Sequence, residues 1–298
     1  MAQSNLGNAY QALGNHESSI PLLKQAVETY YNALKVRTRE KTPWEWATTQ
    51  HNLGNSLSRL GENEVGTKRL KRAIIAYQNT LMVWTKEEFP LDWALAQSNL
   101  GNVIEKIAKR DDNIVILKQA IEAYRNALTV RTRDKLPLEW AQTQNNLGGA
   151  LIALGVRENS LKYFVQSIAA CRNALSVQSI DRVPLDWATT QNTLGNAFLA
   201  LSDHSLDTSQ LEQAEEAYLN ALRAQTKNRV PLQWAKTQGN LGNVYGAYYD
   251  KTKDTAYLDR AETHMQAALE LFNIAAPRYA EMAQEQLQQI AQRRGVSG

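Results

Sequence analysis

The sequence has one cysteine, Cys171, and only four histidines, which limits the chemistry that the chain can carry. A single cysteine cannot form an intramolecular disulfide, and it suits a reducing compartment. The histidines are spread along the chain, and they form no pattern typical of a metal site or a histidine-based catalytic triad. The sequence also has no glycine-rich phosphate-binding loop. We therefore expect no catalytic residues, no metal and no cofactor.

Long apolar runs and an excess of one charge are also missing. No uninterrupted apolar run approaches the ~20 residues that cross a bilayer, and the start of the chain lacks the features of a signal peptide. The net charge is +3 over 298 residues, with acidic and basic residues interspersed. A charge this small gives no electrostatic reason to expect nucleic acid or a membrane as a partner. We expect a soluble, cytoplasmic protein.

What the sequence does contain is a repeat of 47 residues. The recurring residues are a proline (Pro43, Pro90, Pro137, Pro184, Pro231), a tryptophan three places later (Trp46, Trp93, Trp140, Trp187, Trp234) and a Leu-Gly pair (Leu53-Gly54, Leu100-Gly101, Leu147-Gly148, Leu194-Gly195, Leu241-Gly242). A sixth Leu-Gly pair stands earlier, at Leu6-Gly7. A fixed period of this length is typical of a stacked repeat array.

Each repeat is predicted to be a pair of helices. The first helix begins at the proline, whose missing N–H costs nothing at that position. We expect it to end near a second Leu-Gly pair, with Gly61 or Gly155 as a left-handed cap, whereas the earlier glycines serve close packing. The second helix shows apolar residues at helical spacing around Tyr124. Cys171 takes the place of that tyrosine and is expected to be a buried packing residue.

The two ends of the array differ from its middle. Residues 2–8 match residues 96–102 letter for letter, yet the first copy lacks the proline and the tryptophan. We therefore expect that the chain was cut from a longer protein or that another domain originally preceded it. Pro277 starts a polar helix that would cap the stack. The predicted organisation is one domain over 1–298, with repeats at about 1–42 (truncated), 43–89, 90–136, 137–183, 184–230 and 231–276 and a capping helix at 277–294.

Two motifs within each repeat resemble the tetratricopeptide repeat family. The first helix carries Leu-Gly followed by an apolar residue, as in Leu147-Gly148 with Leu151, and the second carries Ala120, Tyr124 and Ala127. The usual unit has about 34 residues, so this chain resembles a long-unit bacterial variant. The resemblance implies an all-α fold, a right-handed α-solenoid of about six helix-turn-helix repeats with a C-terminal capping helix. It also implies that the first helices line a concave groove in which peptides bind.

Asparagines border the Leu-Gly pairs and would face that groove. One set precedes the pair (Asn5, Asn52, Asn99, Asn146, Asn240) and one follows it (Asn8, Asn55, Asn102, Asn196, Asn243), with Thr193 and Gly149 as the exceptions. An amide is both donor and acceptor, so these side chains could grip a peptide backbone, or they could link neighbouring helices. We expect ligand selectivity to come from variable positions in the groove, among them His51, Arg59 and Lys106.

The sequence therefore favours a non-catalytic scaffold that binds a protein or peptide in its concave groove. We expect it to be the sensor or docking arm of a larger bacterial protein. One alternative is a structural spacer that self-associates through its open N-terminal end. The near-identity of the repeats also permits a consensus-designed repeat protein.

Overall fold

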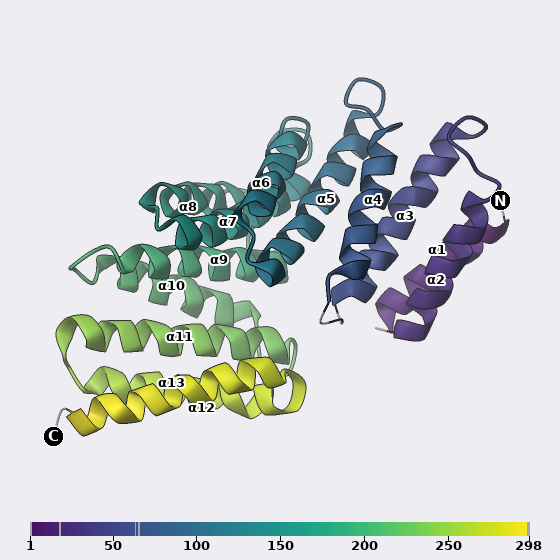
Figure 1. Cartoon of the computed structure of the whole chain (residues 1–298). Coiled ribbons are helices and arrows are strands. Elements are labelled where there is room, and N and C mark those ends of the chain that lie inside the picture. The colour runs from purple at the N-terminus through teal and green to yellow at the C-terminus, as the bar shows by residue number, and fades with distance from the viewer. Residues whose placement is uncertain (1, 18, 63, 65, 297–298) are drawn as a thin grey trace. The chain divides into compact units, whose positions relative to one another are not determined.

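The computed structural model describes residues 2–17, 19–62, 64 and 66–296, and over these residues the chain forms thirteen α-helices and no β-strand. The helices, shown in Figure 1, are α1 (Ala2–His16), α2 (Ile20–Leu34), α3 (Pro43–Glu62), α4 (Lys68–Leu81), α5 (Pro90–Asp111), α6 (Ile114–Leu128), α7 (Pro137–Glu158), α8 (Leu161–Leu175), α9 (Pro184–Ser202), α10 (Ser209–Ala224), α11 (Pro231–Thr252), α12 (Ala256–Ala275) and α13 (Pro277–Val296). The predicted all-α class is confirmed.

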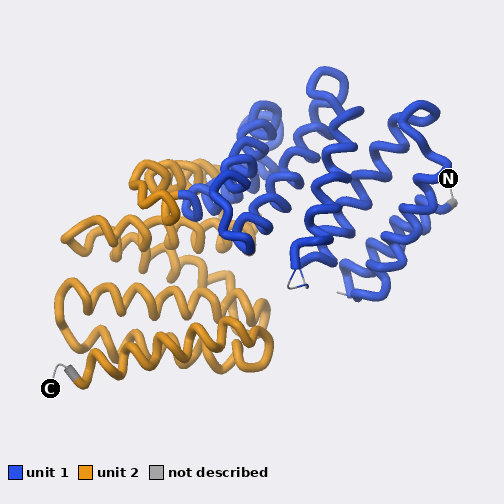
Figure 2. The backbone as a smooth tube through the Cα atoms, in the orientation of Figure 1, with its two compact units in different colours: residues 1–154 blue, residues 155–298 orange. Residues whose placement is uncertain are grey.

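The helices belong to two compact units, residues 1–154 (unit 1) and residues 155–298 (unit 2), which Figure 2 colours separately. In unit 1, α2 packs against α1 and α3, and α4 packs against α3 and α5. In unit 2, α9 packs against α8 and α10, α11 against α10 and α12, and α13 against α12. Neighbours in sequence are thus neighbours in space, as in a helical solenoid. The single domain over 1–298 stays a prediction.

The first helices begin where the prolines predicted. α3, α5, α7, α9 and α11 start at Pro43, Pro90, Pro137, Pro184 and Pro231. Proline suits this position because its φ is already helical and because the first N–H groups of a helix have no partner within it. The periodic proline is therefore the signal that sets the repeat boundary.

A glycine lets the two helices of a pair approach each other closely. A Cβ added to Gly54 would come within 2.9 Å of Cε1 of Tyr77, and one added to Gly195 within 2.7 Å of Cε1 of Tyr218. Both tyrosines are buried, with at most 2% of their surface exposed. The ring occupies the space that a larger residue would need, so the glycine of the Leu-Gly pair serves close packing, as predicted.

The second glycine of the first helix does not have the role that the sequence suggested. Gly61 and Gly155 lie inside α3 and α7, and no glycine that the structure describes has a positive φ. The left-handed residues are Asp112, Asn159 and Lys253. A Cβ at position 61 would lie only 2.7 Å from Cδ2 of Leu70, so this position has room for glycine alone. The predicted cap is therefore wrong, and close packing against the second helix explains this glycine too.

At four junctions, a polar contact joins the residues that follow a second helix to the next first helix. The guanidinium of Arg131 donates to Oγ1 of Thr143 at 3.1 Å, and burial lowers the pKa of Arg131. The equivalent pairs are Arg37–Thr49, Gln178–Thr190 and Gln225–Thr237. Where Trp84 takes the place of the arginine, Ala96 takes the place of the threonine. The recurring threonine is thus structural.

Candidate functional site

The predicted asparagines link successive first helices by side-chain hydrogen bonds. The Nδ2 group of Asn99 on α5 donates to Oδ1 of Asn55 on α3 at 3.2 Å. The equivalent bonds are Asn52 to Asn8 at 3.0 Å, Asn146 to Asn102 at 2.9 Å and Asn240 to Asn196 at 3.2 Å. We call these four contacts the amide links. Three lie in unit 1 and one in unit 2, and each joins one first helix to the next.

A tyrosine of the second helix completes each amide link. The hydroxyl of Tyr77 donates to Oδ1 of Asn55 at 2.7 Å, and Tyr30, Tyr124 and Tyr218 do the same to Asn8, Asn102 and Asn196. Burial, with the charge of Glu62 as a smaller cause, raises the pKa of Tyr77, so this hydroxyl stays protonated. The carbonyl oxygen of Asn55 then accepts two hydrogen bonds, which is its full capacity.

The amide links fix these side chains without using all of their polar groups. In the part of the chain that the structure describes, no hydrogen bond uses the Nδ2 group of Asn55 or the Oδ1 atom of Asn99. Both residues are partly exposed. One donor and one acceptor per link therefore remain for a ligand, held in place by bonds that the fold already makes.

In unit 1, five of the predicted residues line one surface hollow of about 200 Å³. We call it the α3–α5 hollow; its lining includes Asn55, Arg59, Glu62, Asn99, Asn102 and Lys106. Glu62 accepts from Nη1 of Arg59 at 2.8 Å and also from Nζ of Lys106. Burial alone would raise the pKa of Glu62, but these two cations together lower it. The hollow is thus polar and carries one more positive charge than negative.

His51 does not belong to this surface. Its side chain is only 5% exposed, and its ring lies 5.0 Å from the ring of Trp84 and 5.5 Å from that of Tyr77. Burial lowers the pKa of His51 to about 4, so the ring is neutral near pH 7. The prediction that His51 determines selectivity is corrected, because the residue is a packed core histidine with little surface to offer a ligand.

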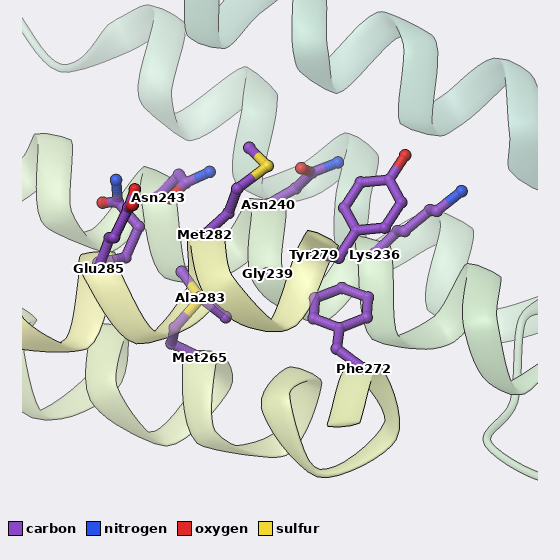
Figure 3. Close-up of a pocket in the computed structure, with 11 residues that line it drawn as sticks. Lys236, Gly239, Asn240, Asn243, Met265, Phe272, Tyr279, Met282, Ala283 and Glu285 are labelled. Atoms are coloured by element: carbon purple, nitrogen blue, oxygen red, sulfur yellow. The ribbon is translucent and has the colours of Figure 1, made fainter. Parts of the chain in front are cut away.

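A second concavity, of about 190 Å³, lies among α11, α12 and α13 in unit 2. We call it the α13 pocket. Met265, Phe272 and Ala283 are its buried apolar lining, and Tyr279 and Met282 stand at the surface with 41% and 54% exposure. Figure 3 shows Asn240, Tyr279 and Met282 pointing to the same side. Of the predicted residues, Asn240 and Asn243 line this pocket.

Of the predicted residues, Asn5 takes part in neither the amide links nor the α13 pocket, and it is exposed on α1. Gly149 and Thr193, the two exceptions, cannot form an amide link, and Thr193 instead donates to the carbonyl of Thr189 in its own helix.

The tyrosine–asparagine bond and the α13 pocket were not predicted from the sequence. The first has a signal in the sequence: where Gly149 replaces the asparagine, Cys171 replaces the tyrosine and Thr193 replaces the second asparagine. Positions that change together are expected to serve one contact. The α13 pocket has no such periodic signal.

Among the described residues, no three His, Cys, Asp or Glu side chains come together as metal ligands would, and none of the helices is both long and apolar enough to span a membrane.

Comparison with known proteins gives the following similarities. A family model described as "Tetratricopeptide repeat" matches residues 1–35 and 140–181, and no curated protein matches the chain. The solved structure of BtubC (BKLC) from P. vanneervenii is similar with a TM-score of 0.50 and 19% identity, over 84% of this chain and 91% of that one. At this identity the likeness is one of fold.

Two further structures are similar at lower TM-scores. YrrB, described as a TPR protein with an unusual peptide-binding site, has a TM-score of 0.47 and 19% identity over 83% of this chain and 100% of that one. A Rap protein, solved in complex with competence and sporulation factor, has a TM-score of 0.47 and 14% identity over 95% of this chain and 74% of that one.

Proposed function

We propose that the chain, which matches a tetratricopeptide repeat model over residues 1–35 and 140–181, is a non-catalytic scaffold that binds an extended peptide along the side chains of its first helices. The observation that carries the proposal is the α3–α5 hollow with its amide links. There the fold holds Asn55 and Asn99 in place and leaves an amide donor and an amide acceptor to the ligand. A peptide backbone presents matching groups at every residue.

Preorganisation explains why this arrangement suits binding. Ordering a side chain on association costs roughly 0.5–1.5 kcal/mol. The bonds from Tyr77 and Asn99 restrain Asn55 before a ligand arrives. Arg59 and Lys106, which share Glu62, would add preference for acidic ligand residues. We further propose that the chain is the sensor or docking arm of a larger bacterial protein.

The test begins with selection of ligands from a displayed library of random 12-residue peptides, followed by titration of the best ones by fluorescence anisotropy. The sharpest variant is Asn55→Asp, because aspartate keeps the oxygen that Tyr77 and Asn99 bond to but lacks the Nδ2 donor. We expect the dissociation constant to rise about tenfold, the value of roughly one hydrogen bond to a ligand, with little change in unfolding.

Asn79→Asp is the matched control, since Asn79 is a partly exposed asparagine on α4, outside the hollow. It should leave the affinity unchanged. If no peptide is enriched, or if Asn79→Asp weakens binding and Asn55→Asp does not, the proposed function is wrong.

A structural spacer that self-associates is the second candidate, and one observation favours it. Leu6 and Leu13 on α1 are 48% and 49% exposed, whereas Leu53 and Leu60, at the same repeat positions, are 3% and 2% exposed. Exposed apolar side chains of this kind favour association with another surface. Light scattering should then detect oligomers that Leu6→Lys/Leu13→Lys dissociates; a chain that stays monomeric at high concentration would exclude this candidate.

A further inference from the structure

The α13 pocket departs from the polar pattern of the first-helix surfaces. Its lining is mainly apolar, with Met265, Phe272 and Ala283 buried and with Tyr279 and Met282 exposed beside them. Large apolar side chains kept at a surface mark places where another molecule binds. The pocket volume of about 190 Å³ is below the ~300–1,000 Å³ that is usual for whole small-molecule ligands. A space of this size suits one large apolar side chain.

Gly239 keeps the pocket open. The positions equivalent to Gly239 in the other repeats all carry a side chain: Ser4, His51, Ser98, Asn145 and Asn192. A Cβ on Gly239 would meet only Cβ of Ala268 and Cε2 of Phe272, both at 3.8 Å, which is ordinary contact. Unlike Gly54 or Gly195, this glycine is therefore not required by packing. Its effect is to leave space beside Phe272.

Two charged residues line the pocket, and neither is in an ion pair within the described chain. Lys236 lies on α11 with its Nζ 4.8 Å from the ring centre of Tyr279, and Glu285 lies on α13. In Figure 3, Lys236 stands at one end of the pocket beside Tyr279, and Glu285 stands at the other end near Asn243. The apolar space is thus flanked by one positive and one negative group.

We propose that the α13 pocket binds a single leucine-like or aromatic side chain of a peptide that carries an acidic residue on one side and a basic residue on the other. This inference rests on the proposed peptide-binding function and specifies its ligand. The acidic residue pairs with Lys236 and the basic residue with Glu285. The exposed amide of Asn243 and the carbonyl of Asn240, whose Nδ2 is used by its amide link, bond to the peptide backbone.

The spacing of the two charges can be gauged along α11, because Glu285 lies near Asn243 in Figure 3. Lys236 and Asn243 are seven residues apart on α11, a rise of about 10 Å at 1.5 Å per residue. An extended peptide covers that length in about three residues. The acidic and basic residues of the ligand should therefore lie about three positions apart, with the apolar residue between them.

The probes are two fluorescein-labelled peptides, Ser-Asp-Gly-Leu-Lys-Ser-Gly and the same sequence with glycine in place of leucine, each titrated against the full chain by anisotropy. We expect the leucine peptide to bind at least tenfold more tightly, about what burial of one leucine side chain contributes. Gly239→Leu, which fills the pocket from its own backbone, should remove that difference without lowering the unfolding temperature. Lys236→Glu should weaken the leucine peptide, whereas Lys162→Glu on the exposed face of α8 should not.

Three results would overturn the inference: equal binding of both peptides, no effect of Gly239→Leu, or binding of N-acetyl-leucinamide as tight as that of the peptide. The last would mean that the pocket holds a small apolar molecule. If library-selected peptides respond to Asn55→Asp but not to Gly239→Leu, the pocket inference fails while the proposed function stands. If no peptide of any kind binds, both fail.

Discussion

Replacing Gly101 by alanine should destabilise unit 1, whereas the same replacement at Gly149 should stabilise it. Both glycines lie inside first helices, Gly101 in α5 and Gly149 in α7. Their surroundings differ. A Cβ on Gly101 would lie 2.8 Å from Cε1 and 2.9 Å from Cδ1 of Tyr124, closer than real contacts. A Cβ on Gly149 would meet only Oε1 of Glu105, at 3.6 Å.

The expected magnitudes follow from these distances. Alanine is favoured over glycine inside a helix by roughly 1 kcal/mol, and at Gly149 nothing opposes that gain. At Gly101 the methyl group must displace a ring that is fully buried and whose hydroxyl is bonded to Asn102 and Glu105. Overpacking of this kind costs roughly 1–3 kcal/mol. The net result should be a loss of about 1 kcal/mol, and the two variants should differ by about 2 kcal/mol.

Amide hydrogen exchange measured by mass spectrometry is the appropriate assay, because repeat arrays open locally and need not unfold in one step. Peptides from α5 and α6 should exchange faster in Gly101→Ala, and peptides from α7 should exchange more slowly in Gly149→Ala. Equal stabilisation by both substitutions would show that Tyr124 tolerates the methyl group. The close-packing explanation of the Leu-Gly pair would then be refuted.

Three further predictions concern buried polar groups. Burial lowers the pKa of His51 to about 4 in the folded chain, below the value of about 6.5 expected in the unfolded chain. As the pH falls from 6.5 to 4, the unfolded chain therefore binds a proton at this residue and the folded chain does not. The free energy of unfolding should drop by up to roughly 3 kcal/mol over this range. His51→Gln should flatten that pH dependence in unfolding experiments, while His16→Gln should not. Tyr77→Phe removes one hydrogen bond to Asn55 and should cost about 1 kcal/mol, measured by exchange in α3 and α4, with Tyr31→Phe as the control; an equal effect of both would contradict the assigned bond. Burial raises the pKa of Cys171 to about 12, so its thiol should react with a disulfide reagent only after denaturation, and rapid reaction of the native chain at pH 8 would show that the residue opens to solvent.

Helices and their order were predictable because their signals are local and recur. Proline at the first helical position marks the start of α3, α5, α7, α9 and α11, and five copies of one signal leave little ambiguity. The ends of these helices were harder to place. The sequence does not distinguish a glycine that caps a helix from a glycine that makes room for a neighbouring side chain. At Gly61 the contact with Leu70 in the structure shows that the second role applies.

The candidate site was predictable where it repeats and unpredictable where it does not. The asparagines were predicted because they recur, but their bonds to Tyr77 and its equivalents join residues 22 positions apart on two different helices. His51 occupies the same repeat position as Ser4 and Ser98, and its polar side chain led to the prediction that it lies at the groove surface. In the structure the side chain is buried. The α13 pocket forms where three helices meet around Gly239, and no single segment of the sequence predicts it.

The amide links also affect how this array can be re-engineered. Each one joins an asparagine of one repeat to an asparagine of the next, so a junction drawn anywhere between two linked repeats separates a donor from its acceptor. Cassettes that are shuffled, duplicated or deleted must therefore carry compatible residues on both sides of every seam. A chimera that obeys this rule should keep its new neighbours in register, whereas one that joins Asn55 to a repeat with threonine in place of Asn99 should slip or loosen at that seam.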